Sequence, residues 1–99
     1  MLTSKQRATL RSAASRMDAI FQIGKGGVGD AAVKSISDAL EARELVKISV
    51  LDNSDEDPRD AGEAIAAATD SEVVAVIGRK IILFRVSSKP EKRAISTLL

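Results

Sequence analysis

The sequence has no cysteine and no histidine, and its only aromatic residues are two phenylalanines. Disulfide bonds, thiol nucleophiles and the common zinc sites are therefore excluded. With so few aromatic rings, base stacking cannot be the main way in which this chain would bind nucleic acid. No apolar run approaches about 20 residues, and the first residues lack the pattern of a signal peptide, so we expect a cytoplasmic protein that does not enter a membrane.

The sequence also contains few side chains suited to catalysis. Without histidine or cysteine, acid–base catalysis would fall to carboxylates or lysines, and no paired arrangement of these stands out. The acidic run at residues 52–57 lacks the glycine and the final glutamate of a calcium loop, which favours a solvated loop. We therefore expect a protein that is not an enzyme, with no catalytic residue, metal, nucleotide or other cofactor.

Charge is present in quantity and is unevenly distributed. The 99 residues carry a net charge of +1, yet residues 1–29 hold five basic and one acidic side chain, and residues 79–99 hold six and one. The middle segment, residues 30–78, holds four basic and twelve acidic side chains. A domain polarised in this way can present a basic face to a polyanion. The alternative is an interaction module whose acidic middle segment docks a basic protein.

Three helices are predicted from capping signals and apolar spacing. Thr3 opens a T-x-x-Q capping box that predicts a helix over residues 4–17. Asp30 can cap a second helix, and Asp57 followed by proline is typical of the start of a third, over residues 58–69. The expected core residues of these helices are Leu10, Ala13, Ala14, Met17, Val33, Ile36, Leu40, Ala61, Ala64, Ile65 and Ala68.

Strands are predicted from short apolar or alternating runs at residues 19–23, 46–50, 73–77 and 81–86. Gly78 can supply a positive φ between the last two, which predicts a hairpin. The order α-β-α-β-α-β-β indicates an α/β (α+β) fold with a mixed four-stranded sheet, because strand-helix-strand connections favour parallel pairing. We expect one monomeric domain over residues 1–86, followed by a basic, mobile C-terminal tail over residues 87–99.

A glycine-rich segment, Gly-Lys-Gly-Gly-Val-Gly-Asp at residues 24–30, lies between the first predicted strand and the second predicted helix. Its spelling imitates the dinucleotide fingerprint G-x-G-x-x-G, but Glu44 precedes its strand where that fold needs an acidic residue at the strand's end. The spelling also imitates a phosphate-binding loop of ATPases. Asp30 and Ala31 stand where that loop needs Lys and Ser or Thr, so ATP hydrolysis is not expected.

A G-x-x-G loop with a cation inside it is the interpretation that remains. Bare glycine backbone allows a phosphate to approach closely, and a similar loop in KH modules clamps single-stranded nucleic acid. A turn that merely joins strand to helix is the alternative, although one or two glycines would suffice for that. Binding of this kind should be weakly sequence-specific and strongly dependent on salt. The candidate RNA-binding residues of the loop are Gly24, Lys25, Gly26 and Gly27.

Further basic residues flank the loop in the sequence. On the first predicted helix, Lys5, Arg7 and Arg11 fall outside the apolar stripe and should face water. On or beside the final hairpin, basic side chains could meet RNA phosphates, or could be solvated charges that deter strand aggregation. These hairpin candidates are Arg79, Lys80 and Arg85.

Four blocks of sequence together resemble the CRM domain (chloroplast RNA splicing and ribosome maturation) in its bacterial, single-domain, YhbY-like form. The blocks are LTSKQR at residues 2–7, FQIGKGGV at 21–28, ALEARELVKI at 39–48 and VIGRKIILFR at 76–85. The resemblance implies a fold similar to the C-terminal domain of bacterial translation initiation factor three. It also implies RNA binding through the G-x-x-G loop, supported by Lys5, Arg7 and Arg11. For bacterial members it implies association with ribosomal RNA in precursors of the large ribosomal subunit.

Overall fold

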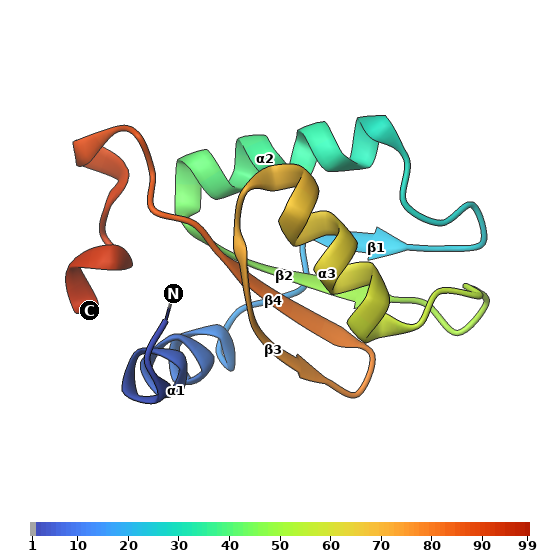
Figure 1. Cartoon of the computed structure of the whole chain (residues 1–99), viewed down its shortest axis with the longest axis horizontal. Coiled ribbons are helices and arrows are strands. Elements are labelled where there is room, and N and C mark those ends of the chain that lie inside the picture. Colours follow the sequence, from blue (N-terminus) through green and yellow to red (C-terminus); the bar gives the residue numbers. More distant parts are fainter. Residues whose placement is uncertain (1) are drawn as a thin grey trace.

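The computed structural model describes residues 2–99 and confirms the predicted order of elements (Figure 1). Two short 3-10 turns follow the last strand. Among residues 2–99, no helix is both long and apolar enough to cross a bilayer. The elements are α1 (Ser4–Ala14), β1 (Phe21–Ile23), α2 (Asp30–Arg43), β2 (Leu45–Val50), α3 (Pro58–Thr69), β3 (Glu72–Ile77), β4 (Lys80–Phe84), and the turns η1 (Pro90–Lys92) and η2 (Ser96–Leu98).

The four strands form one mixed sheet in the order β1-β2-β4-β3. The β1–β2 pair is parallel, as a strand-helix-strand connection favours, whereas β2–β4 and β4–β3 are antiparallel. Gly78 turns the β3–β4 hairpin with a φ of +59°, as predicted. The register of β3 against β4 shifts between Val73 and Ala75, which marks a bulge on the outer strand β3.

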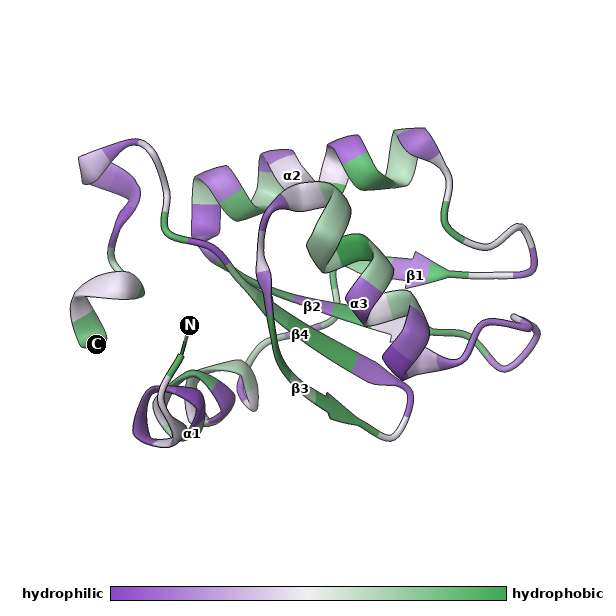
Figure 2. Cartoon of the chain, viewed as in Figure 1, coloured by the Kyte–Doolittle hydropathy of each residue, from purple (hydrophilic) through white to green (hydrophobic). Residues whose placement is uncertain are grey.

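Helices cover both faces of the sheet, and each face has its own apolar cluster. Helices α2 and α3 lie on one face and α1 lies on the other (Figure 1), and apolar residues concentrate in the central strands (Figure 2). The cluster beneath α2 and α3 consists of Ile23, Ile36, Leu40, Val46, Ile48, Val50, Ala61, Ile65, Ala66, Ile81 and Leu83. The cluster beneath α1 consists of Leu10, Ala14, Leu45, Val74, Ile82 and Phe84.

Helix α1 is shorter than predicted. The capping box at Thr3 is present, but the helix ends at Ala14 and not at Met17. The Lys47 ammonium, reaching from β2, donates hydrogen bonds of 3.3 Å to the carbonyl oxygens of Ala14 and Met17. These carbonyls therefore have partners outside a regular helix, and Met17 still packs against the α1 cluster from a turn.

Two details of α2 and α3 also differ from the prediction. The N-cap of α2 is Gly29, and Asp30 is its first helical residue. In α3, the bounds are as predicted, but Ala64 and Ala68 are exposed. The buried stripe includes Gly62 and Ala66 instead, because small residues occur on every side of this helix and their spacing alone cannot choose the inner face.

The C-terminal segment folds back onto the domain and is not the free tail that the sequence suggested. Glu44, the C-cap of α2, has a φ of +67° and is fully buried. Its carboxylate accepts hydrogen bonds from the backbone N–H groups of Ser87 (2.7 Å) and Ser96 (2.9 Å). Ile95 packs against the α1 cluster. The hydrogen bonds of Glu44 could not be predicted from local sequence patterns, because the partners are 43 and 52 residues apart.

Candidate nucleic-acid interface

The G-x-x-G loop projects from the end of β1 (Figure 1). The Gly27 N–H donates to the Gly24 carbonyl at 3.0 Å, which closes a tight turn around Lys25 and Gly26. Both of these central residues are exposed, and a methyl group placed on Gly26 would meet nothing within 4 Å. The loop therefore offers bare backbone and one ammonium group to the solvent.

Gly27 is favoured by its backbone conformation, and the space beside it is occupied by an acidic side chain. Its φ is +71°, and a methyl group on it would lie 3.0 Å from the Glu56 carboxylate oxygen Oε1. The acidic loop between β2 and α3 thus lies directly beside the G-x-x-G loop, which the sequence did not indicate. Because this carboxylate repels phosphate, an anion is favoured on the Lys25–Gly26 side of the turn.

The N-terminus of α2 follows the loop after a short connection. Its N-cap, Gly29, has no side chain to accept a hydrogen bond from the first turn. Free N–H groups at a helix N-terminus attract anions, although Asp30 contributes a negative charge to the same turn. At this end of the molecule, the uncapped helix N-terminus favours an anion and the Asp30 carboxylate opposes it.

Arg79 and Lys80 lie at the same end of the sheet as the loop. The Arg79 guanidinium donates to the carbonyl oxygens of Val50 and Leu51, both at 2.9 Å, and the Leu51 N–H in turn donates to Ile23 at the end of β1. Arg79 therefore holds the hairpin tip against the end of β2. Lys80 is exposed and donates one hydrogen bond of 2.8 Å to the Ser49 hydroxyl, so it remains open to solvent.

Arg85 lies at the other end of β4 and is not brought together with these residues. Its side chain is only 20% exposed. The guanidinium donates to the Ser37 hydroxyl (3.0 Å), the Ser37 carbonyl (2.8 Å) and the Thr69 carbonyl (2.7 Å). It also lies 3.8 Å from the Glu41 carboxylate. Arg85 thus joins α2 to the end of α3, and we leave it out of the candidate interface.

The basic residues of α1 divide into exposed and engaged side chains. Lys5 and Arg11 are exposed, as expected. Arg7 does not simply face water, because its guanidinium donates to the carbonyl oxygens of Val73 (2.6 Å) and Val74 (3.2 Å). The bulge in β3 presents both carbonyls at the sheet edge, and one Arg7 nitrogen binds both.

Glu72 lies 3.9 Å from the Arg7 guanidinium. Partial burial alone would raise the pKa of Glu72, but the hydrogen bond from the Leu2 N–H (3.1 Å) and nearby positive charge, Arg7 included, hold it below its usual value. Glu72 is therefore ionised at neutral pH and offsets the charge of Arg7.

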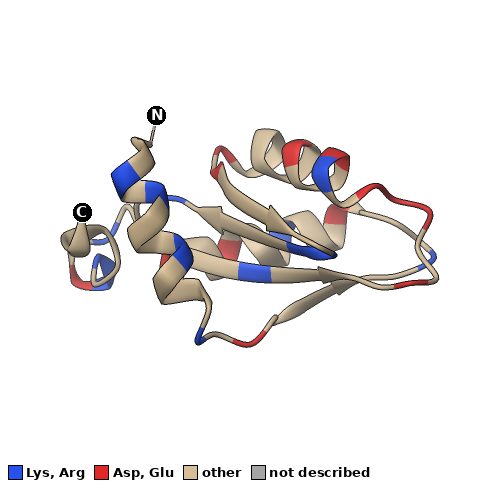
Figure 3. Ribbon diagram, turned by 90° about the horizontal axis from the view of Figure 1, so that it is seen from below, with Lys and Arg blue, Asp and Glu red and all other residues tan. Residues whose placement is uncertain are grey.

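Several cations share the sheet face on which α1 lies (Figure 3). Lys47 reaches α1 from this face, and Lys80 and Ser49 share its side of the sheet because side chains alternate along a strand. Lys47 is engaged by the Ala14 and Met17 carbonyls, so we call the set of Lys5, Arg11, Lys80 and the loop residue Lys25 the basic face. Within residues 2–99, no group of three His, Cys, Asp or Glu residues is arranged to hold a metal ion.

Comparisons with known proteins agree with this architecture. A family model described as the CRS1/YhbY (CRM) domain matches residues 2–85. The Bacillus subtilis protein named "Probable RNA-binding protein YqeI" is 49% identical over 89 residues, which cover 90% of this chain and 93% of that relative. The Methanocaldococcus jannaschii protein named "Probable RNA-binding protein MJ0652" is 32% identical over 102 residues, which cover 93% and 75% respectively.

A solved structure shares the fold as well. The solution structure of a hypothetical protein from Staphylococcus aureus is similar with a TM-score of 0.77 and 48% identity, and the match covers 91% of this chain and 94% of that one. The resemblance identified from four sequence blocks is therefore confirmed. Since the family model spans every helix and strand from α1 to β4, the chain belongs to the CRS1/YhbY (CRM) domain family.

Proposed function

We propose that this protein binds RNA, and that it acts as an assembly factor on ribosomal RNA in precursors of the large ribosomal subunit. The observation that carries the proposal is the exposed G-x-x-G turn, with the Lys25 ammonium at its tip and a helix N-terminus without a side-chain cap behind it. Several relatives are named as RNA-binding proteins, which supports RNA as the ligand. The ribosomal role rests on the family resemblance.

Recognition in this proposal depends on the RNA backbone and not on its bases. Phe84 is 5% exposed, and Phe21 packs against the α2–α3 cluster, so neither ring is available as a stacking platform. Lys25 would pair with one phosphate while the glycine backbone approaches it closely. Other cations of the basic face would contact neighbouring phosphates. Binding should therefore weaken steeply as salt rises.

The acidic middle segment supports the alternative, docking of a basic protein, less well. Asp57 accepts hydrogen bonds from the first turn of α3, and Asp52 lies 3.5 Å from Arg79. Glu56 fills the space beside Gly27. Asp57 and Glu56 are thus engaged by neighbouring segments, which leaves fewer carboxylates for a partner, while Asp52 stays exposed.

Titration of large-subunit ribosomal RNA fragments at several salt concentrations tests the binding proposal. Lys25→Ala should weaken binding and reduce the magnitude of the salt slope by roughly one unit, because one phosphate contact is lost. A Lys25→Ala, Gly26→Asp double variant should bind more weakly still. Lys92→Ala is the matched control, since it removes one exposed lysine from η1, in the C-terminal segment that lies at the opposite end of the molecule from β1 (Figure 1). Equal affinity of the Lys25 and Lys92 variants would contradict the proposed role of the loop.

Crosslinking in cells, followed by sequencing of the attached RNA, tests the assembly role separately. We expect ribosomal RNA of the large subunit to be enriched over other RNA. Recovery of messenger RNA without ribosomal RNA would reject the assembly role and leave RNA binding intact.

A further inference from the structure

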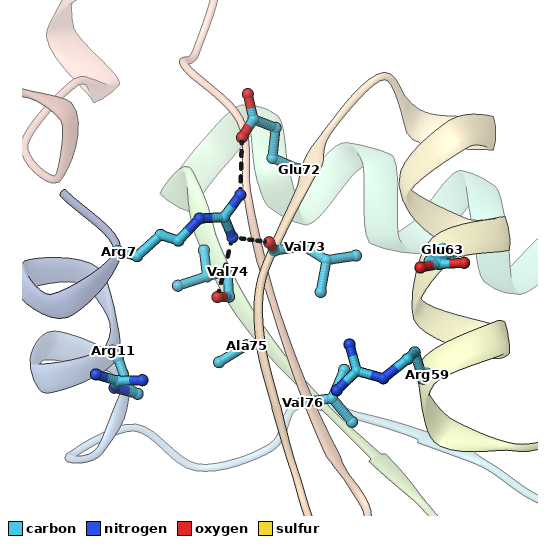
Figure 4. Close-up of a pocket in the computed structure, with 9 residues that line it drawn as sticks. All are labelled: Arg7, Arg11, Arg59, Glu63, Glu72, Val73, Val74, Ala75 and Val76. Atoms are coloured by element: carbon cyan, nitrogen blue, oxygen red, sulfur yellow. Dashed lines mark hydrogen bonds and ion pairs between the residues drawn. The ribbon is translucent and has the colours of Figure 1, made fainter. Parts of the chain in front are cut away.

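A groove of about 630 Å³ runs along the outer edge of β3, between α1 and α3 (Figure 4). Its floor is the strand segment from Val73 to Val76. Arg7 and Arg11 line it from α1, while Arg59 and Glu63 line it from α3. Arginines from two separate helices therefore border the same hollow.

The charges of the groove are not equally available to a ligand. Arg7 is held by the carbonyl oxygens of Val73 and Val74 and is offset by Glu72. Within residues 2–99, the side chains of Arg11 and Arg59 have no hydrogen-bond or ion-pair partner, and both residues are exposed. Two unengaged guanidinium groups thus border the groove, with Glu63 as the opposing charge on α3.

We propose that this groove is a second contact for the RNA backbone, in which Arg11 and Arg59 bind phosphates; this rests on the proposed RNA-binding function. A guanidinium group presents donors in a fork that matches two phosphate oxygens, which suits it to a backbone contact. Arg59 was not a candidate from sequence, because it lies within the acidic middle segment. Its place on the groove emerges only from the packing of α3 beside β3.

A peptide that adds a strand to the edge of β3 is the competing occupant, and the structure favours it less. Strand addition needs a row of free backbone groups in regular register. Arg7 already occupies two neighbouring carbonyls, and the bulge between Val73 and Ala75 interrupts the register. The groove is therefore better suited to a negatively charged ligand than to an added β-strand.

The length of the RNA separates the groove from the G-x-x-G loop. None of the loop residues lines the groove, so a strand must be long enough to reach both. A single strand of about four nucleotides, the length that such a loop clamps in KH modules, should fill the loop alone. A long single strand should engage both places. Only the long strand should then respond to changes in the groove.

Three single variants test the proposal with these two RNA probes. Arg59→Gln should weaken binding of the long strand several-fold and lower the salt slope by about 0.7, the loss expected for one phosphate contact on single-stranded RNA. Glu63→Gln should strengthen binding of the long strand, because it removes the opposing charge. Arg43→Gln is the control, since Arg43 is exposed at the end of α2 and does not line the groove. The four-nucleotide strand should bind all three variants like the unmodified protein.

The outcomes distinguish the two proposals. If Arg59→Gln binds the long strand no more weakly than Arg43→Gln, the groove proposal is overturned, while loss of binding in the Lys25→Ala, Gly26→Asp variant would still support the loop. If the unmodified protein binds neither RNA, both proposals fall. A peptide that shifts the NMR signals of the β3 amides, where the long RNA shifts none, would assign the groove to strand addition and overturn the RNA contact.

Discussion

The two faces of the sheet differ in how many apolar residues they bury and in how many polar side chains they carry. Beneath α2 and α3, eleven buried residues form a continuous apolar cluster, whereas six form the cluster beneath α1. The single helix α1 covers only part of its face, and the strands on this face also carry the polar side chains Lys47, Ser49 and Lys80. One face therefore holds most of the buried apolar residues, and the other leaves room for cations.

The same contrast applies to individual basic side chains. Arg85, between α2 and α3, uses its guanidinium in three hydrogen bonds within the fold. Arg11, on α1, has no side-chain partner within residues 2–99. The two residues carry the same charge, yet only an arginine without internal partners, such as Arg11, is available to a ligand.

The largest expected effect is on the free energy of unfolding, and it differs between the two apolar clusters. Ile65→Ala should lower the free energy of unfolding by about 4 kcal/mol, because Ile65 is fully buried in the larger cluster and its removal leaves a cavity. Leu10→Ala should cost about 3 kcal/mol, since α1 packs alone and can shift to reduce the cavity. Urea unfolding with an unchanged m-value would measure both. An equal or larger loss of stability for Leu10→Ala would contradict the expected difference between the two clusters.

The next effect concerns the buried carboxylate at the α2–β2 corner. Glu44→Ala should cost about 3 kcal/mol, because the N–H groups of Ser87 and Ser96 lose a charged acceptor. Hydrogen exchange at these two amides should accelerate. Glu91→Ala, which changes an exposed residue of the same segment, should alter stability little. Equal stability of the two variants would show that the segment is held by other contacts.

A crossed pair of variants sharpens the distinction between engaged and available cations. Arg85→Ala should cost about 2 kcal/mol of stability and leave the salt slope of RNA binding unchanged, because its hydrogen bonds are internal. Lys25→Ala should leave the stability unchanged and reduce the magnitude of the salt slope. Thermal unfolding and salt titration on both variants complete the test. A change in salt slope for Arg85→Ala would return that residue to the RNA-binding surface.

The smallest expected effect is the pH dependence of the contact between Glu41 of α2 and Ser88. Hydrogen bonds from the Ser88 hydroxyl and backbone N–H, with Arg85 nearby, lower the pKa of Glu41 below its ordinary value of 4.5. Ionised Glu41 therefore stabilises this contact fully above about pH 4.5 and loses it as the pH falls through the lowered pKa. NMR titration of the Ser88 amide should show this loss, and Glu41→Gln should abolish it. A Ser88 signal that does not change below pH 4.5 would contradict the contact.

Local signals in the sequence predicted the elements well. Asp57 followed by Pro58 gave the start of α3 correctly, and Gly78 gave the hairpin. These features act within a few residues of themselves, so no distant partner is needed to interpret them. The end of α1 was placed wrongly, and there Lys47, a residue of another element, binds the carbonyl of Ala14, the last residue of the helix.

The site residues were harder to interpret for the same reason. Whether Arg7, Arg79 or Arg85 is available depends on carbonyl groups that lie 16 to 67 residues away along the chain. Nothing in the spacing of the basic residues reveals those acceptors. Lys25 was easier, because the glycines that expose it are its immediate neighbours.

The contact between Glu44 and the C-terminal segment has a consequence for the order of folding. During synthesis, the corner between α2 and β2 emerges about half a chain before the donors at Ser87 and Ser96. Until those residues leave the ribosome, the Glu44 carboxylate must stay hydrated, so the corner cannot close around it. Closure of this corner is thereby linked to residues that are translated well after the corner itself, and a nascent chain held before residue 87 would keep it open.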